Sequence, residues 1–293
     1  MRPRFPVVLS LLLTITTLGP ASAAGAGGVR PMPGERHLTG PEKAAALAAM
    51  GPTERASIGG RFSDPRVIVG AHARRYFKIE PGPGGSQSLR PVGIVSDDPG
   101  SSLSIPSLET GAVTSNYRKY DLFISVTVSR LSGYRWEIYT YVYWYGGREA
   151  GCCNRSMDVV GQAWNRNLAY ESQSASGRYR DCLGPIDSSD MAIYRDTISP
   201  GEGVGWEFAE WRNCYEDDWS QGIWAHGLMH HAEFRAYVSE SRWQGEQATI
   251  ASTYYHTFPY WTTGYSLSFS GPSMSISPTN DQWRAAVAVS ISV

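Results

Sequence analysis

Three histidines in the C-terminal third of the chain form its only histidine cluster, and Glu233 follows them closely. His226 and His230 have the spacing with which two histidines of a helix bind zinc, but Gly227 lies between them and the zincin glutamate is missing. The residues that follow alternate as in a strand, which places His231 and Glu233 on one face. His226, His230 and His231 are therefore candidates for a metal site, and His231 with Glu233 for an acid–base pair. A partly exposed polar face is the simpler interpretation.

Two further carboxylates, Glu207 and Glu210, lie among tryptophan and phenylalanine residues. A glycosidase needs two carboxyl groups on either side of the scissile bond, with aromatic rings under the sugar. Residues three apart on a strand face opposite sides, however, so this pair does not converge on one bond. Glu207, Glu210 and Glu233 are the catalytic candidates of a hydrolase hypothesis, and outward-facing carboxylates on an amphipathic strand are the alternative.

A row of four alternating tyrosines is the best candidate for binding: Tyr139, Tyr141, Tyr143 and Tyr145. If this face is open, it offers flat rings with hydroxyl groups, which suit stacking on sugars or contact with another protein. The alternative is that the row forms a second buried face of a central strand, covered by loops or by the N-terminal leader. The sequence leaves both possibilities open.

The tyrosine row belongs to the clearest structural pattern in the chain, residues 119–147. Apolar and polar residues alternate on both sides of residues 131–133, which predicts two strands joined by a hairpin loop. Further strands are expected at 66–69, 76–79, 157–164, 191–198, 204–211, 230–238, 249–258, 265–270, 273–277 and 283–293, whereas 165–184 is polar and predicted as a loop. This pattern predicts an all-β, mainly antiparallel fold, a β-sandwich or antiparallel barrel with one short N-terminal helix.

The N-terminal region has the features of an export signal followed by a leader. Arg2 and Arg4 precede an apolar stretch that ends in Ala21-Ser22-Ala23, so residues 1–23 are predicted to be a signal peptide. Residues 24–60 form a flexible leader with a helix at 41–50, which either packs on the sheet or belongs to a cleaved pro-segment. Residues 61–293 are expected to form a single β-rich domain, with a sub-boundary near 80–104 as the alternative division.

Four cysteines follow this export signal, at Cys152, Cys153, Cys182 and Cys214. Disulfides are the expected state in an exported protein. Because a bond between adjacent cysteines is strained, Cys152 and Cys153 are each expected to pair with Cys182 or Cys214, in an order that the sequence leaves open. Each bridge would stabilise the fold by about 3–4 kcal/mol in the chain-entropy account.

Composition and motifs exclude several functions. The formal net charge is −1, which gives no basic face for nucleic acid. No run after the signal is long and apolar enough for a stable membrane span, and no phosphate-binding or dinucleotide-binding glycine motif points to a cofactor.

We expect a secreted extracellular binding or interaction module rather than an enzyme, directed through its aromatic face at a polysaccharide, a cell wall or another extracellular protein. The alternatives are an exported glycosidase-like hydrolase and a membrane-inserting β toxin, the latter suggested by the alternation in 121–128 and 266–270.

Overall fold

The computed structural model describes fourteen strands and parts of their connections. The residues described are 36, 39–42, 68–83, 87–97, 120–145, 157–165, 168–179, 191, 193–209, 211–214, 225–240, 247–257, 266–277 and 282–292. The signal peptide, most of the leader and three of the four cysteines lie outside these residues. Of the predicted helix at 41–50, the structure describes only residues 41 and 42, which are helical together with residue 40.

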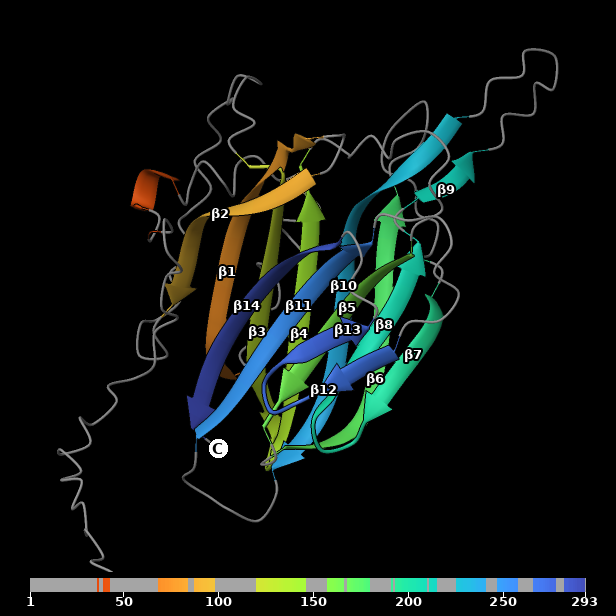
Figure 1. Ribbon diagram of the computed structural model, residues 1–293. Coiled ribbons are helices and arrows are strands. Elements are labelled where there is room, and N and C mark those ends of the chain that lie inside the picture. Colours follow the sequence, from red (N-terminus) through yellow and green to blue (C-terminus); the bar gives the residue numbers. More distant parts are fainter. Residues whose placement is uncertain are drawn as a thin grey trace, which may run out of the picture.

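The larger of the two main sheets, sheet A, has its strands in the order β2-β1-β3-β4-β10-β6, and β9 pairs with one end of β10. All neighbours in it are antiparallel. Its strands are β1 (Ile68–Pro81), β2 (Gln87–Asp97), β3 (Leu122–Ser132), β4 (Arg135–Trp144), β6 (Leu168–Tyr179), β9 (Trp211–Cys214) and β10 (Ala225–Glu240), as Figure 1 shows.

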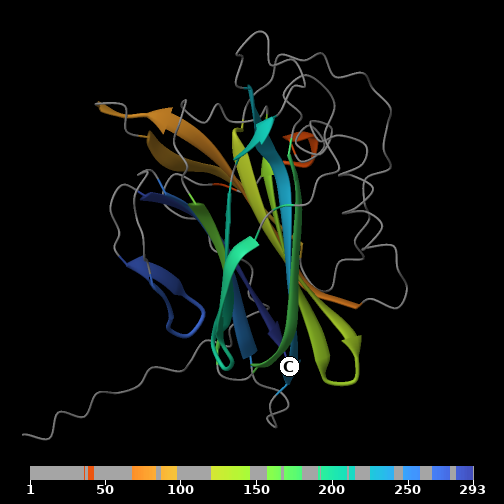
Figure 2. The same ribbon diagram turned by 90° about the vertical axis from the view of Figure 1, so that its right-hand side faces the viewer.

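Sheet B has its strands in the order β14-β11-β5-β8-β7, again all antiparallel. They are β5 (Met157–Trp164), β7 (Ile193–Ser199), β8 (Gly203–Ala209), β11 (Gln247–Thr257) and β14 (Gln282–Ser292). A separate two-stranded hairpin consists of β12 (Ser266–Phe269) and β13 (Met274–Ser277). Sheets A and B stack face to face, and the β12–β13 hairpin lies outside sheet B (Figure 2).

The fold is therefore an all-β antiparallel sandwich, which confirms the predicted class. The described part of the chain contains no helix with the length and hydropathy of a membrane-spanning segment. β1 and β2 pair from Pro81↔Gln87 to His72↔Asp97, so both strands belong to sheet A. The division of residues 61–293 into one domain or two stays a prediction.

Several details of the strand prediction were wrong, and β2 was not expected at all. The two short strands expected at 66–69 and 76–79 form one continuous strand, β1. The turn expected at 131–133 lies at Gly133 and Tyr134, because β3 continues to Ser132, which pairs with Arg135. The polar segment 165–184, expected to be a loop, contains the twelve-residue strand β6. β6 is an edge strand of sheet A and half of its residues are exposed, so its composition lacks the apolar residues of a central strand.

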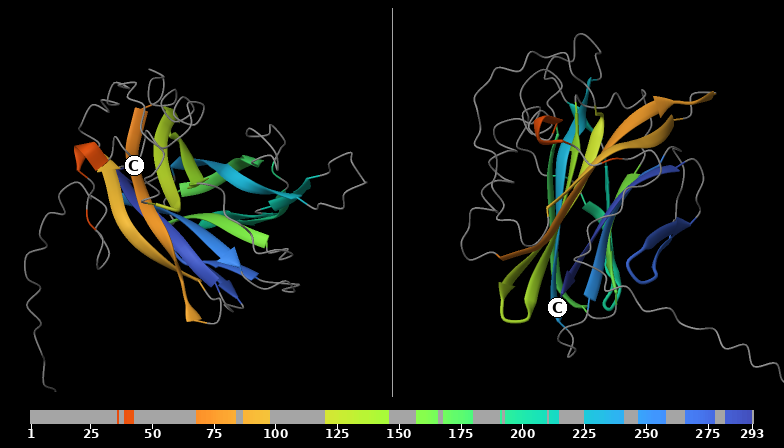
Figure 3. Two further views of the ribbon diagram at one scale, coloured as in Figure 1. Left: turned by 90° about the horizontal axis from the view of Figure 1, so that it is seen from above. Right: turned by 90° about the vertical axis from the view of Figure 1, so that its left-hand side faces the viewer.

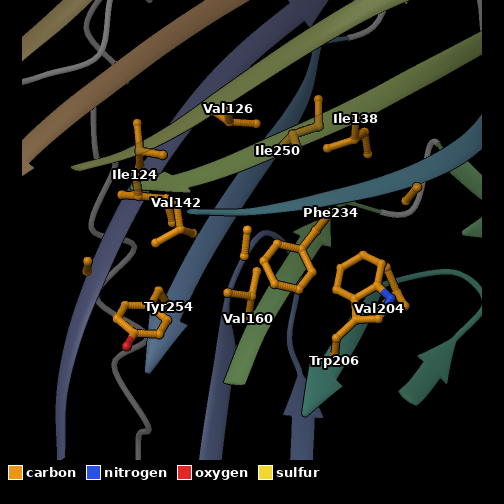
Figure 4. Close-up of a cluster of buried hydrophobic side chains, with 14 of the residues drawn as sticks. Ile124, Val126, Ile138, Val142, Val160, Val204, Trp206, Phe234, Ile250 and Tyr254 are labelled. Carbon is orange, nitrogen blue, oxygen red and sulfur yellow. The ribbon is translucent and has the colours of Figure 1, made fainter. Parts of the chain in front are cut away.

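The main core fills the space between the two sheets (Figure 4). Sheet A contributes Val126, Ile138 and Phe234, among others, and sheet B contributes Trp206 and Ile250. The rings of Phe234 and Trp206 approach to 5.2 Å between centroids, across the interface between the sheets. Alternate residues of each strand supply this layer, as expected for a sandwich.

A polar contact joins the two sheets in the middle of this apolar layer. Gln162 Nε2 of sheet B donates to Thr140 Oγ1 at 2.8 Å and to the carbonyl oxygens of Phe234 and Ile138 at 3.0 and 3.2 Å in sheet A. Thr140 Oγ1 in turn lies 2.5 Å from Ser252 Oγ. Buried hydrogen bonds of this kind favour one register of the two sheets over others.

Candidate functional site

The outer face of sheet A, which points away from sheet B, carries a second buried layer made mostly of aromatic rings. We call this set the aromatic layer: Tyr76, Tyr120, Phe123, Tyr139, Tyr141, Tyr143, Tyr145, His230 and His231. Alternation in β4 directs the tyrosines away from the main core, yet Tyr139, Tyr141 and Tyr143 are only 3%, 0% and 3% exposed. Of the two possibilities that the sequence left open, the structure has the buried face. Tyr145 is half-buried at the end of the row.

The rings of the aromatic layer form a continuous series of contacts. Phe123 of β3 stacks on Tyr143 with centroids 5.3 Å apart and planes 14° apart, and on Tyr141 at 5.8 Å. Tyr139 and Tyr141 stack at 6.3 Å, and Tyr143 meets the edge of Tyr145 at 4.9 Å. Offset and edge-to-face pairs at these separations stabilise a packed layer beyond the apolar area they bury.

A β-bulge brings the two adjacent histidines onto the same face. In the pairing of β10 with β6, Met229 is opposite Tyr179 and His231 is opposite Arg178, so His230 is the extra residue of the bulge. His231 stacks on Tyr141 at 5.5 Å and His230 meets Tyr143 edge-on at 4.8 Å. Simple alternation would have placed these neighbours on opposite faces.

The two imidazoles contact each other directly, with 3.0 Å between His230 Nδ1 and His231 Nδ1. This distance suits one shared proton, with one nitrogen as donor and the other as acceptor. Metal binding by His226, His230 and His231 stays a prediction. The backbone of His226 pairs with Asn213, four residues before His230 along β10. The residues that the structure describes contain no cluster of three or more histidine, cysteine, aspartate or glutamate side chains suited to a metal ion.

Cationic side chains lie against the aromatic layer on both sides. The guanidinium of Arg74 lies over the ring of Phe123 at 4.8 Å and donates to the Tyr76 hydroxyl at 3.3 Å. Arg235 lies over Tyr139 at 5.4 Å. Burial raises the pKa of the Tyr145 phenol well above its usual range, and the nearby Tyr76 adds to the shift while Arg74 opposes it. The layer thus combines rings, hydroxyl groups and cations, unlike the main core.

Two of the three carboxylates proposed for catalysis, Glu207 and Glu233, lie on different sheets. Trp206 belongs to the main core, so its strand neighbour Glu207 points to the outer face of sheet B. Phe234 likewise belongs to the core, so Glu233 points to the outer face of sheet A, where Arg235 donates to it at 2.8 Å. Glu207 and Glu233 therefore lie on opposite outer faces. Glu210 is outside the described residues.

Each predicted disulfide involves a cysteine outside the described residues. Cys152, Cys153 and Cys182 lie outside the described residues, and Cys214 is the last residue of β9, where only its backbone is described. β9 pairs with the first residues of β10, from Ala225↔Cys214 to Leu228↔Trp211. The pairing of the four cysteines stays a prediction.

One buried polar cluster was missed by the sequence analysis. Asp158 of β5 accepts a hydrogen bond from the Tyr254 hydroxyl of β11, and its other oxygen lies 2.9 Å from His256 Nδ1. The His256 ring stacks on Trp283 of β14 at 4.9 Å. Asp158 and His256 are 98 residues apart, and only the pairing of β5 with β11 brings them together, so no local sequence signal could have shown the contact.

Comparisons with known proteins add little to this description. No protein-family model and no curated protein matches the chain. Among solved structures, the chain is distantly similar to two bacterial adhesin domains. The collagen-binding domain of a Staphylococcus aureus adhesin has 5% identity and a TM-score of 0.23 over 52% of this chain and 87% of that one. The KRT10-binding region domain of the pneumococcal serine-rich repeat protein PsrP has 9% identity and a TM-score of 0.26 over 53% and 86%.

A third solved structure, described as a pore forming protein, has 8% identity and a TM-score of 0.27 over 74% of this chain and 96% of that chain. TM-scores this low carry no information about what the present chain binds or does.

Proposed function

We propose that this protein is an exported binding protein whose ligand, a carbohydrate, is bound at the Tyr145 end of the aromatic layer. The observation that carries the proposal is the series of contacting rings that runs from Tyr139 to the half-buried Tyr145. Tyr145 also contacts Tyr120 at 6.2 Å and Phe123 at 5.9 Å. A ligand that stacks on Tyr145 therefore meets a ring held in place by three others.

The chemistry of this end of the layer fits a sugar better than a purely apolar ligand. Aromatic rings pack against the C–H faces of a pyranose, and phenol hydroxyls hydrogen-bond its hydroxyl groups. Arg74, which lies over Phe123 and contacts the Tyr76 hydroxyl, adds a charged donor next to the rings. Charge-assisted hydrogen bonds of this kind are stronger than neutral ones.

The positions of Glu207 and Glu233 favour a protein that binds a glycan over one that hydrolyses it. Glycoside hydrolysis uses two carboxyl groups roughly 5–10 Å apart on one site. Glu207 and Glu233 point away from each other on the two outer faces, and Glu233 is held by Arg235. We therefore propose a binding role.

The test is a titration of the protein with a panel of soluble polysaccharides and oligosaccharides, followed by intrinsic fluorescence and calorimetry. Tyr145→Ala is expected to weaken binding at least about tenfold, the size of an average contribution from an aromatic anchor. Tyr134→Ala is the matched control, because Tyr134 lies in the β3–β4 turn, at the opposite end of β4 from Tyr145, and is 60% exposed. Absence of binding to every glycan, or equal losses in the two variants, would contradict the proposal.

A further inference from the structure

The β12–β13 hairpin is a strictly amphipathic element. Leu267 pairs with Ile276 and Phe269 with Met274, and serines occupy the positions between them. The four apolar side chains pack toward sheet B, whereas the serines of both strands are exposed. Residues 266–277 contain no charged side chain. The hairpin closes through Ser270 N, which donates to the carbonyl of Ser273 at 3.0 Å.

The surface of sheet B beneath the hairpin is built from glycines. A Cβ atom on Gly161 would lie 1.9 Å from Met274 Sδ, and one on Gly205 would lie 2.5 Å from Leu267 Cδ1. A Cβ on Gly203 would lie 2.4 Å from Phe269 Cδ1. The apolar side chains of the hairpin thus occupy the space that side chains of β5 and β8 would otherwise fill. We call these three residues the glycine floor.

Side-chain packing holds the hairpin on this floor. The strands β12 and β13 pair only with each other in the part of the chain that the structure describes, and they form a sheet of their own. The Tyr255 hydroxyl donates to the Met274 carbonyl at 2.5 Å, and Val159, with Tyr255, completes the apolar contact. Figure 3 (right) shows the hairpin as a separate pair of strands outside sheet B. An isolated two-stranded hairpin is marginal by itself, so its docked position depends on these contacts.

The apolar surface of this contact is distributed unequally. The hairpin supplies Leu267, Phe269, Met274 and Ile276, whereas sheet B supplies the glycine floor together with Val159 and Tyr255. If the hairpin leaves, most of the apolar side-chain surface leaves with it, and sheet B keeps few large apolar groups to expose. Detachment of the hairpin therefore exposes little apolar surface of sheet B to water. The apolar side chains of the hairpin, in contrast, need another apolar environment once they have left the glycine floor.

We propose that the β12–β13 hairpin is a detachable element that inserts its apolar face into the interface of a lipid bilayer. A bilayer fits better than a protein partner because the hairpin has no charge to desolvate or to pair, and its alternation suits a boundary between lipid and water. The strands have four residues each, less than half of the roughly nine to eleven that a spanning strand needs. The insertion is therefore interfacial, with the serine face and the outer backbone edges in contact with water and headgroups.

Vesicle binding tests this proposal directly. The full chain is mixed with phosphatidylcholine vesicles and with vesicles that also contain phosphatidylglycerol, and the bound fraction is measured by flotation. Binding to both kinds is expected. Phe269→Ser is expected to lower the partition coefficient at least about tenfold, because a buried phenylalanine contributes more than one order of magnitude. Ile198→Ser is the control, since Ile198 is an apolar side chain of β7 that is 42% exposed outside the hairpin.

Absence of binding, binding to anionic vesicles alone, or equal effects of Phe269→Ser and Ile198→Ser would each overturn the proposal. A second variant tests whether the hairpin has to leave the floor. Gly161→Cys with Met274→Cys places two thiols where the methionine side chain now lies. When oxidised, this variant is expected to lose vesicle binding and to regain it on reduction, with the wild type under the same reductant as control. Undiminished binding of the oxidised form would contradict detachment.

Discussion

The two outer faces of this sandwich are both covered, but in different ways. On sheet A, the cover consists of large side chains of the sheet's own strands, such as Phe123 and Tyr141. On sheet B, the strands β5 and β8 have glycines, and a separate hairpin supplies the apolar side chains. The first cover cannot leave without unfolding the strands that carry it, whereas the second can leave as a unit. The comparison teaches that two equally buried faces of a sheet can differ in whether the covering side chains can move away without unfolding of the sheet.

The largest expected effect comes from removing a ring at the centre of the aromatic layer. Tyr141 is fully buried and stacks on Phe123, Tyr139, Tyr143 and His231. Tyr141→Ala is expected to lower the free energy of unfolding by about 3–5 kcal/mol, as for other large buried rings. Urea denaturation measures the change. Tyr134→Ala, at an exposed turn, should change it by less than about 0.5 kcal/mol. A loss below about 1 kcal/mol for Tyr141→Ala would mean that the layer is loosely packed.

A smaller effect is expected from the glycine floor. Gly205→Val places atoms where Leu267 now lies and should lower the free energy of unfolding by about 1–3 kcal/mol, because overpacked contacts must shift. The hairpin should give way before the sheet does, so limited proteolysis is expected to cleave within residues 266–277 first. Gly201→Val is the control, since a Cβ there meets nothing within 4 Å. Equal cleavage of Gly205→Val and Gly201→Val within residues 266–277 would contradict the inference that the hairpin depends on the glycine floor.

The alkaline limit of stability should depend on the aromatic layer. In the unfolded chain a tyrosine has a pKa of about 10. Because burial raises the pKa of Tyr145 in the folded state, the unfolded chain releases this proton first. The free energy of unfolding is therefore expected to fall as the pH rises above about 10. Below that pH, the stabilisation that the protonated Tyr145 gives the folded state is fully present. Tyr145→Phe should reduce this slope, measured by urea denaturation between pH 8 and 11; an unchanged slope would contradict the assignment.

The smallest effect is expected on the water-facing side of the hairpin. Ser268 Oγ and Ser275 Oγ lie 2.7 Å apart and are exposed. Ser268→Ala should change the free energy of unfolding by no more than about 0.5 kcal/mol, because water replaces the lost partner. The same variant should leave vesicle binding unchanged, in contrast to Phe269→Ser. A loss of vesicle binding in Ser268→Ala would place the serine face, rather than the apolar face, against the lipid.

Alternation along each strand predicted most of the fold, because one face of every central strand must pack on the core. It failed at β6, where an edge position allows polar residues on both faces. It also could not show that β4 pairs with β10, some ninety residues away, because strand order depends on contacts between segments and not on local pattern.

The candidate site was predicted in part. The tyrosine row was visible in the sequence, but alternation in β4 does not show whether the row is buried, because that depends on rings of other strands such as Phe123 and His231. The common face of His230 and His231 depends on a bulge against β6, which alternation does not reveal. The glycine floor was equally hidden, because single glycines in β5 and β8 acquire a meaning only when the hairpin at 266–277 is placed over them.

Hydrogen–deuterium exchange of the intact protein tests the difference between the two covers most directly. Backbone amides of β12 and β13 are expected to exchange through local opening, at least about a hundredfold faster than those of β3 and β4, which should exchange only on global unfolding. Equal protection of the hairpin and of the strands that carry the aromatic layer would show that the hairpin is a fixed part of the sandwich and would contradict the account.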